Sequence, residues 1–354
     1  MPTAKKEKHV FWFDDGRRPN AADALEAKYQ DITVHRLAFD GPQADNWGAM
    51  SISQAYCITS ARHEVPDEYK AHAALIERCP DLLAVSTTGA GYDTVDVPAC
   101  TAAGVLVVNQ TGSNADAVSE HAVAMMLSLT KKIPQTDRSL RTERGVSRET
   151  FKGWNANGRT LGIIGFGNVG TRVARICGLG LQMRVLAYDP YVSKEKIEAG
   201  GATKVDLATL LKEARFISVH CPLTDETGDM IAGPQLAAMP AGGYVITTAR
   251  GGIVSEGALE AALKSGHIAG AGLDVWVEEP PPLTHPLLKL DNVIASYHTA
   301  GVTHDSRIAM AEWNGQQVAG ILRGERPPRL VNPEVWDKYV PRFERVFGFR
   351  PGAS

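Results

Sequence analysis

The fold is decided by residues 160–170, which read Thr160-Leu161-Gly162-Ile163-Ile164-Gly165-Phe166-Gly167-Asn168-Val169-Gly170. The apolar run predicts a buried parallel strand, and the G-x-G-x-x-G turn after it opens a helix predicted over residues 168–179. In such a turn Gly165 permits the tight bend, Gly167 lets the backbone approach a pyrophosphate, and Gly170 lets helix and strand pack closely. Free N–H groups at the helix start favour phosphate. The stretch predicts a dinucleotide site; the competing hypothesis is a Gly-rich turn that binds nothing.

A second apolar strand, Val185-Leu186-Ala187-Tyr188, ends in the carboxylate of Asp189. Asp189 follows Gly170 by 189 − 170 = 19 positions, where a carboxylate can accept both hydroxyls of an adenosine ribose. It would repel a 2′-phosphate, and the residues that follow it, Pro190 and Tyr191, are not arginines. The sequence therefore predicts NAD as the cofactor rather than NADP.

Length and composition limit the classes of protein to which the chain can belong. A chain of 354 residues suggests two domains. Its 44% hydrophobic and 22% charged residues are typical of a soluble globular protein. Because the net charge is −3, we expect neither nucleic acid nor an anionic membrane surface as a partner. No apolar stretch approaches the length of a membrane span.

The cysteines and the N-terminus bear on the compartment. The five cysteines are odd in number, scattered and without a C-x-x-C pair, which predicts reduced thiols and no metal site. The basic N-terminus is followed by an apolar run of only residues 10–13, too short for the core of a signal peptide. We therefore expect a cytoplasmic protein.

The first part of the chain alternates strands and helices. Strands are predicted over 9–13, 32–35, 55–59 and 82–86, and helices over 21–28 and 68–78. This alternation indicates a parallel, helix-covered sheet that forms a unit of its own. A long helix is predicted over 115–130, and the polar segment 134–157 is interpreted as a linker or as an arm that packs on another subunit.

The second half predicts another doubly wound sheet that ends near residue 300. We call residues 160–170 the fingerprint. After it, strands are predicted over 185–188, 216–220, 243–248, 270–275 and 293–296, and helices over 207–213, 256–265 and 306–323. The Pro-rich segment 327–328 is expected to end the fold. If the tail returns to the first unit, the domains are discontinuous, with boundaries predicted at 1–114 plus 305–354 and at 115–304.

Three polar residues follow predicted parallel strands in the second half. They are Arg250, Glu279 and His298. Ligands of doubly wound sheets bind off the carboxyl ends of the strands, so a cation, a carboxylate and an imidazole could converge on one site. The plainer alternatives are a solvated arginine and a structural histidine.

Runs along the chain resemble the D-isomer-specific 2-hydroxyacid dehydrogenase family. The matching runs, in the family's order over roughly residues 80–320, are Gly89-Ala90-Gly91-Tyr92-Asp93-Thr94-Val95-Asp96, Gly112-Ser113-Asn114, Glu120-His121, residues 160–170, His220-Cys221-Pro222-Leu223-Thr224, Thr248-Ala249-Arg250-Gly251-Gly252, Gly270-Ala271-Gly272-Leu273-Asp274-Val275, Glu279-Pro280 and His298-Thr299-Ala300-Gly301. The resemblance implies an α/β protein with two doubly wound parallel-sheet domains. One is a Rossmann-type NAD-binding domain and the other a flavodoxin-like substrate domain, with a cleft between them.

The resemblance also implies a role for each polar residue. His298 would be the general acid in reduction and the base in the reverse direction. Glu279 would orient the imidazole and favour its charged form, and Arg250 would bind the substrate carboxylate and polarise the carbonyl. The cofactor-binding residues implied are Gly165, Gly167, Asn168, Val169, Gly170, Asp189, Pro190, His220, Cys221, Pro222, Thr227, Thr248, Ala249, Arg250, Asp274, His298, Ala300 and Gly301. The substrate-binding residues implied are Gly89, Ala90, Gly91, Asn114, Arg250 and His298.

Some positions depart from the family's patterns. Thr247 stands where Asn is frequent and Tyr297 where Pro is usual. Formate dehydrogenases carry Gln at the Glu279 position, which argues against formate. Thr59 and Thr87 stand where phosphoglycerate dehydrogenases place arginines, although Arg62 is close in sequence. No regulatory domain is expected after about residue 345, and the substrate is expected to be a small, unphosphorylated 2-keto acid.

The sequence leaves several readings open. The leading hypothesis is an NAD-dependent reductase of 2-keto acids to D-2-hydroxy acids, and D-3-phosphoglycerate dehydrogenase is the alternative enzyme. An NAD-sensing, corepressor-like binding protein is the alternative of another class, because such proteins share the fold and the catalytic residues. By the same resemblance we expect a homodimer formed through the 115–130 helix and the polar segment after it. Ordinary core packing is the other explanation of that helix.

Overall fold

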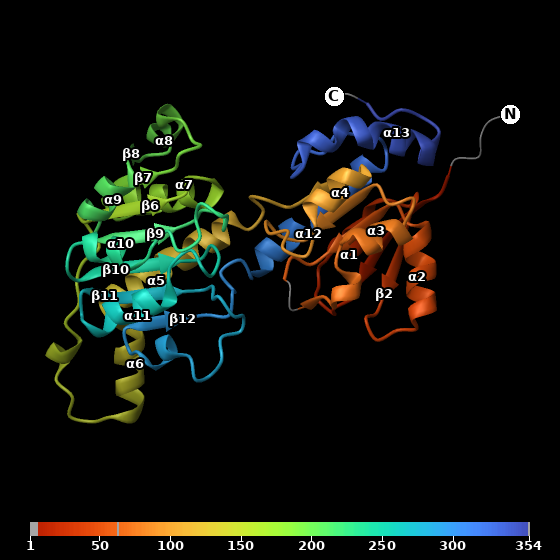
Figure 1. Cartoon of the computed structure of the whole chain (residues 1–354). Helices are drawn as coiled ribbons and strands as arrows, with labels where there is room; N and C mark the ends of the chain where they lie inside the picture. Colours follow the sequence, from red (N-terminus) through yellow and green to blue (C-terminus); the bar gives the residue numbers. More distant parts are fainter. Residues whose placement is uncertain (1–5, 62–63, 353–354) are drawn as a thin grey trace. The chain divides into compact units, whose positions relative to one another are not determined.

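A computed structural model describes residues 6–61 and 64–352. The chain forms two compact units, each with its own parallel sheet (Figure 1). The first unit comprises residues 1–114 and 303–354, and the second comprises residues 115–302. Among the described residues, no helix combines the length and the apolar character that a bilayer span requires.

The first unit is built on five parallel strands. They are β1 (Lys8–Phe13), β2 (Ile32–Leu37), β3 (Ala55–Ile58), β4 (Ala84–Thr87) and β5 (Leu106–Val108). Their order is β2-β1-β3-β4-β5, so the winding direction reverses between β1 and β3. Open α/β sheets bind their ligands at such a reversal, beyond the carboxyl ends of the strands.

Helices cover both faces of this sheet, because successive strand residues point to opposite sides. Phe11 and Phe13 face the core shared with α2 (Gln43–Ile52), α3 (Ala73–Arg78) and α4 (Val97–Ala103). Val10 and Trp12 face the core shared with α1 (Ala21–Lys28) and α12 (His304–Ile321). A last helix, α13 (Trp336–Phe347), follows the 3-10 turn Pro333–Val335 and packs with α12 against β4 and β5.

The second unit has seven parallel strands. They are β6 (Thr160–Ile164), β7 (Arg184–Tyr188), β8 (Thr203–Lys204), β9 (Phe216–Val219), β10 (Gly243–Thr247), β11 (Ile268–Leu273) and β12 (Val293–Ala295). Their order is β12-β11-β10-β9-β6-β7-β8, which is the Rossmann order with its switch point between β6 and β9. Two parallel sheets of five and seven strands confirm the predicted α/β fold.

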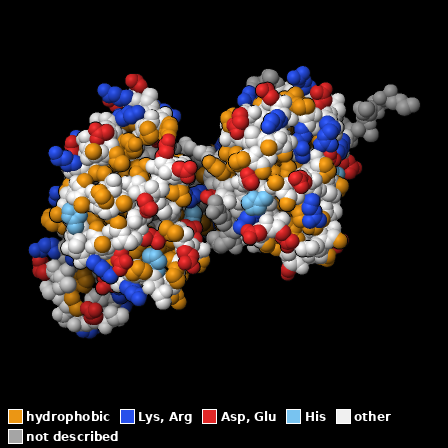
Figure 2. Space-filling view, in the orientation of Figure 1, with side chains coloured by type: hydrophobic (Ala, Val, Ile, Leu, Met, Phe, Trp, Pro, Cys, Tyr) orange, Lys and Arg blue, Asp and Glu red, His pale blue; other side chains and the backbone are white. Residues whose placement is uncertain are grey.

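Two helical layers enclose the second sheet. One layer contains α5 (Ala115–Lys131) and α7 (Asn168–Arg175), and α7 continues as a π-turn over Ile176–Gly180. The other contains α9 (Leu207–Glu213), α10 (Gly233–Ala238) and α11 (Glu256–Lys264). Short helical segments also occur at α8 (Lys194–Ala199) and at Pro286–Lys289. Figure 2 shows charged side chains of both signs interspersed over each unit, as expected for a nearly neutral chain.

Two expectations about local structure were wrong, and the segment interpreted as a linker or an arm contains helical structure. The helix expected over 68–78 is a 3-10 turn, Asp67–Tyr69, and then α3, because Ala71 between them is extended and pairs with Val95. The polar segment 134–157 contains α6 (Ile133–Thr142) and the turn Arg148–Phe151, with Pro134 in the first turn of α6, where its missing N–H costs nothing. The fold does not end at residues 327–328, because α13 follows.

Candidate active site and cofactor cradle

Each glycine of the fingerprint meets a different constraint. Gly165 adopts φ +90°, and a Cβ there would come within 2.5 Å of the Cys221 nitrogen, so the tight turn after β6 excludes other residues. A Cβ on Gly170 would overlap the Gly165 carbonyl oxygen, which is the close helix–strand packing expected of it. A Cβ on Gly167 would meet no atom of the described chain within 4 Å. Packing within the described chain therefore does not require glycine at position 167. A phosphate that approaches this backbone would require it, because a side chain would occupy the same space.

Asp189 lies at the end of β7 with its carboxylate oriented by backbone donors. One oxygen accepts the Phe166 N–H at 2.8 Å and the other accepts the Tyr191 N–H at 2.9 Å. The first of these contacts ties the carboxylate to the fingerprint turn itself. Asn168 and Val169 open α7 directly after the turn, with backbone N–H groups that no earlier helical carbonyl can satisfy.

The loop after β9 forms the other side of the switch point. Pro222 is exposed at the start of this loop, and the Thr227 hydroxyl holds the loop by donating to the Pro222 carbonyl and accepting the Thr224 N–H, each at 2.7 Å. The open backbone at Gly167, the start of α7 and the oriented Asp189 carboxylate together fit a dinucleotide. We call this set of groups the cofactor cradle.

His220 is a neutral polar group at the end of β9. Burial lowers its pKa to about 4. Its Nε2 lies 2.8 Å from the Ser218 hydroxyl and its Nδ1 lies 3.4 Å from the Thr248 hydroxyl. Thr248 and Ala249 follow β10, so this contact links the ends of two neighbouring strands.

His298 and Glu279 form a hydrogen-bonded pair. The His298 Nδ1 lies 2.9 Å from Glu279 Oε2, and Glu279 Oε1 accepts the Trp276 N–H at 3.1 Å. Burial acts to raise the pKa of the Glu279 carboxyl, but the His298 hydrogen bond and charge, the Trp276 N–H and the charge of Arg250 together hold it below the ordinary value. The carboxylate is therefore charged beside a half-exposed imidazole, an arrangement that suits a general acid and base.

Arg250 stands in the loop after β10. Its guanidinium donates to the Ala249 carbonyl at 2.6 Å, and its charge contributes to the lowered pKa of Glu279. The loop also packs closely on the segment that carries Glu279, because a Cβ on Gly251 would overlap the Trp276 backbone. The structure thus brings together Arg250, Glu279 and His298 in the second unit, beyond the carboxyl ends of β10, β11 and β12.

Asp274 has a role that the sequence did not reveal. Its side chain is completely buried, and its oxygens accept the Ser296 hydroxyl at 2.6 Å, the Thr299 N–H at 2.8 Å and the Ala300 N–H at 2.9 Å. The Asp274 carbonyl also accepts the His298 N–H at 2.7 Å. Asp274 therefore anchors the 296–300 loop that carries the imidazole.

His121 of α5 supports the same anchor and was also missed as a site residue. Its Nε2 lies 3.1 Å from the Ser296 hydroxyl and 3.8 Å from Asp274 Oδ1. The signal in the sequence was the Glu120-His121 pair, which the resemblance to the family included without assigning it a role. Spacing alone could not place that pair beside a residue more than 150 positions away.

The predicted substrate residues Gly89, Ala90 and Gly91 lie in the first unit, directly after β4. Their carbonyls are held, since Gly89 accepts the Gln110 N–H, Ala90 accepts the Asn109 amide and Gly91 accepts the Thr87 hydroxyl, each at 2.8 Å. Within residues 6–61 and 64–352, neither Ala90 nor Gly91 donates its N–H to a partner. Two free donors on a Gly-rich turn can grip an anion. Asn114 lies immediately before α5.

Comparisons with known proteins identify the family. The NAD-binding domain of the D-isomer specific 2-hydroxyacid dehydrogenases matches residues 123–300. The chain is 42% identical over 268 residues to a D-3-phosphoglycerate dehydrogenase of Archaeoglobus fulgidus, covering 76% of this chain and 50% of that protein. It is 38% identical over 275 residues to a glyoxylate reductase of Korarchaeum cryptofilum, covering 77% of this chain and 82% of that protein.

A solved structure shows the same fold. D-lactate dehydrogenase of Aquifex aeolicus, complexed with NAD and lactic acid, superposes with a TM-score of 0.76 at 27% identity, covering 91% of this chain and 98% of that one. The chain spans about half the length of the phosphoglycerate dehydrogenase relative but most of the length of the reductase and of this structure. This protein therefore belongs to the D-isomer specific 2-hydroxyacid dehydrogenase family of NAD-dependent oxidoreductases.

Proposed function

We propose that the protein reduces a small 2-keto acid to the D-2-hydroxy acid, and catalyses the reverse oxidation, with NAD as the redox cofactor. The observation that carries the proposal is the His298–Glu279 pair at 2.9 Å, with Arg250 close enough to influence the Glu279 pKa. An acid–base pair and a carboxylate-binding cation are the two protein groups that reduction of a 2-keto acid requires.

The roles of these three residues follow from their surroundings. When bound, NAD supplies or accepts the hydride. His298 donates a proton to the carbonyl oxygen during reduction and removes it from the hydroxyl during oxidation. The charged Glu279 keeps Nδ1 occupied, so that Nε2 is the nitrogen that exchanges the proton. Arg250 binds the substrate carboxylate and polarises the carbonyl.

Other residues would bind rather than react. We assign the binding of the substrate carboxylate to the free N–H groups of Ala90 and Gly91 and to Arg250, and we also assign Asn114 to the substrate. Thr248, Ala249, Asp274, Ala300 and Gly301 would surround the nicotinamide end of the cofactor. Pro190, His220, Cys221, Pro222 and Thr227 would line the adenosine side, where Asp189 accepts the ribose hydroxyls.

The assembled form would be a homodimer. In Figure 1, α6 and the segment after it project from the rest of the second unit. This arm carries exposed apolar side chains, among them Ile133, Leu140 and Trp154. Apolar side chains of this size on a projecting arm favour packing against another protein surface, and a second copy would bury them.

The proposal is tested by the absorbance change of NADH oxidation with glyoxylate, hydroxypyruvate, pyruvate, 2-ketobutyrate, phenylpyruvate and 3-phosphohydroxypyruvate. We expect turnover of at least one of them and its loss in His298→Ala. Tight NADH binding without turnover of any of these acids would refute the enzyme and favour an NAD-sensing binding protein.

A further inference from the structure

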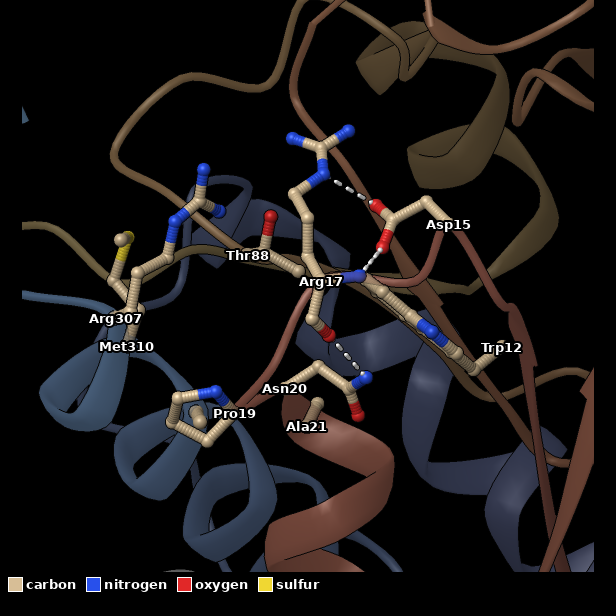
Figure 3. A pocket seen from close by; sticks show the side chains of 10 residues that line it. Trp12, Asp15, Arg17, Pro19, Asn20, Ala21, Thr88, Arg307 and Met310 are labelled. Carbon is tan, nitrogen blue, oxygen red and sulfur yellow. Dashed lines mark hydrogen bonds and ion pairs between the residues drawn. The ribbon is translucent and has the colours of Figure 1, made fainter. Parts of the chain in front are cut away.

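A pocket in the first unit contains two arginines that have no role in the reaction above. The pocket is lined by Asp15 and Arg17 from the loop after β1, by Thr88 directly after β4, and by Arg307 and Met310 of α12 (Figure 3). Because β1 and β4 are parallel, these residues meet beyond the carboxyl ends of the strands. The pocket also borders β1, where the strand order reverses, which is the ligand-binding position of this kind of sheet.

Arg17 is a fixed cation. Its Nε lies 2.8 Å from Asp15 Oδ2 and its Nη2 lies 2.5 Å from Glu64 Oε2. Both carboxylates form ion pairs with Arg17, and Glu64 also accepts the Thr59 hydroxyl. They reduce the positive potential of the pocket, but neither forms an ion pair with the second arginine.

Arg307 is half-buried in the first turns of α12. Its guanidinium forms no hydrogen bond and no ion pair with any residue that the structure describes. Burial and the neighbouring charge of Arg17 lower its pKa, while Asp15 and Glu64 act in the opposite direction. The start of a helix is also an unfavourable place for a cation, because the macrodipole is positive there. The two carboxylates therefore compensate the Arg307 charge only in part, and its pKa stays below the ordinary value.

Thr88 completes the set of available donors. Its hydroxyl has no hydrogen-bond partner among the described residues, and in Figure 3 it is seen between the side chains of Arg307 and Arg17. A guanidinium with five N–H donors beside a free hydroxyl matches an anionic acceptor such as a carboxylate or a phosphate. The pocket is small and partly open to solvent, which suits a compact anionic group.

The position of the pocket connects it to the substrate. Thr88 immediately precedes Gly89, so the pocket borders the turn with the free Ala90 and Gly91 N–H groups. The threonines that replace the arginines of phosphoglycerate dehydrogenases are engaged elsewhere, since Thr59 donates to Glu64 and Thr87 donates to Gly91, each at 2.8 Å. Arg62, which is close to Thr59 in the sequence, lies outside the described residues. Among the residues that the structure describes, Arg307 is a cation of this pocket that forms no ion pair.

We propose that this pocket binds the second anionic group, a carboxylate or a phosphate, of a dianionic 2-keto acid, and that Arg307 and Thr88 determine this specificity. The proposal rests on the proposed 2-keto acid reduction and narrows its substrate class. Arg307 and Thr88 take no part in proton transfer, so their substitution should affect only substrates that carry the second charge.

The test compares pairs of substrates that differ in the second anionic group. Steady-state NADH oxidation is measured with oxaloacetate against 2-ketobutyrate, and with 3-phosphohydroxypyruvate against hydroxypyruvate. We expect at least one dianionic acid to exceed its partner about tenfold in kcat/KM, and the better pair identifies carboxylate or phosphate. Arg307→Met should lower kcat/KM for the dianionic acid about 30-fold and Thr88→Val about fivefold, with changes below about threefold for the partner acid.

Arg326→Met is the matched control, because its exposed guanidinium lies over the Trp336 ring in the same unit, and it should leave both substrates unchanged. Equal kcat/KM within both pairs, or equal loss for both members in Arg307→Met, would overturn the pocket assignment while the reductase stands.

Calorimetry with malonate and with inorganic phosphate separates the two proposals, since either anion should bind wild type more tightly than Arg307→Met even without turnover. Failure of all keto acids to react would refute the reductase, and unchanged anion binding in Arg307→Met would refute the pocket independently.

Discussion

His298 adopts φ 53°, in the left-handed region that residues other than glycine rarely occupy. Such a conformation costs about 1–3 kcal/mol and persists only where surrounding contacts impose it. Here the Asp274 carbonyl holds the His298 N–H, and the Asp274 carboxylate holds the next two backbone N–H groups. We infer that the strain fixes the direction in which the imidazole points.

At this scale Glu279→Gln should change how the reaction depends on pH. The lowered pKa of Glu279 keeps its carboxylate charged throughout the neutral range and somewhat below its ordinary pKa, so a negative charge lies 2.9 Å from the His298 Nδ1 when the imidazole delivers the proton that reduction needs. In the variant, the pH above which kcat/KM for keto acid reduction declines should move to lower values, with a loss of about tenfold or more at pH 8. The measurement is a pH profile of NADH oxidation.

The adjacent exposed residue offers the control. Glu278→Gln removes a charge of the same kind one position away and should retain the wild-type profile. The lowered Glu279 pKa also contributes stability that is present above the unfolded-state pKa, near 4.5, and is lost as pH falls through the folded-state pKa. An unshifted pH profile in Glu279→Gln would show that the carboxylate only positions the loop.

Residues in the loops that follow predicted strands were the most predictable part of the site. Arg250, Glu279 and His298 could be proposed because each follows an apolar run that reads as a parallel strand, and strand ends meet at one edge of a sheet. The hydrogen bonds among His121, Ser296 and Asp274, which hold the 296–300 loop, could not be derived from the sequence. They join α5 to residues more than 150 positions later in the chain. Free donors such as Arg307 are likewise visible only once the neighbours are known.

At the scale of elements, the fingerprint turn separates what the fold needs from what the cofactor needs. A Cβ on Gly167 meets no atom of the described chain, so Gly167→Ala should fold with an unchanged Tm. The added methyl group would occupy the backbone position that approaches the pyrophosphate, and NADH affinity should fall about tenfold or more. Fluorescence titration with NADH checks this, with Gly257→Ala, another open position, as control. Equal NADH affinity in Gly167→Ala and in wild type would show that the turn does not contribute to cofactor binding.

The helix α13 should be needed for the stability of the first unit. Phe343 is fully buried in the core that α12 and α13 share with β4 and β5, so Phe343→Ala should lower the free energy of unfolding by about 3–5 kcal/mol. Denaturant unfolding of the full chain measures the effect. The half-exposed Phe349 provides the comparison, and Phe349→Ala should cost far less. A similar cost for both would mean that α13 is only loosely packed.

Several elements escaped sequence reasoning for a common physical reason. Glycine and proline occur within or at the start of α2, α4, α10 and α13, and these residues ordinarily mark helix ends. Tertiary packing outweighs that preference where the helix buries apolar side chains. The long strands and helices of the second sheet, with clear period and length, were predicted to within a few residues.

At the scale of the whole molecule, the exposed arm predicts a dimer of about twice the 38.1 kDa chain mass. Leu140 is 74% exposed on α6, and a charged side chain at a buried apolar contact is strongly unfavourable. Leu140→Lys should therefore yield monomers in sedimentation velocity, whereas Arg141→Lys, the next residue, should remain dimeric. A monomeric wild-type chain at micromolar concentration would contradict the role of the arm.

The central claim is that His298 exchanges the proton while the cofactor cradle binds NAD independently of it. The most direct measurement pairs kcat for the best keto acid with the NADH Kd, in wild type and His298→Ala. We predict that kcat falls by about 10²–10⁴-fold while Kd changes by less than about threefold, because general acid catalysis contributes on that order. A kcat that survives the substitution would contradict proton exchange by His298.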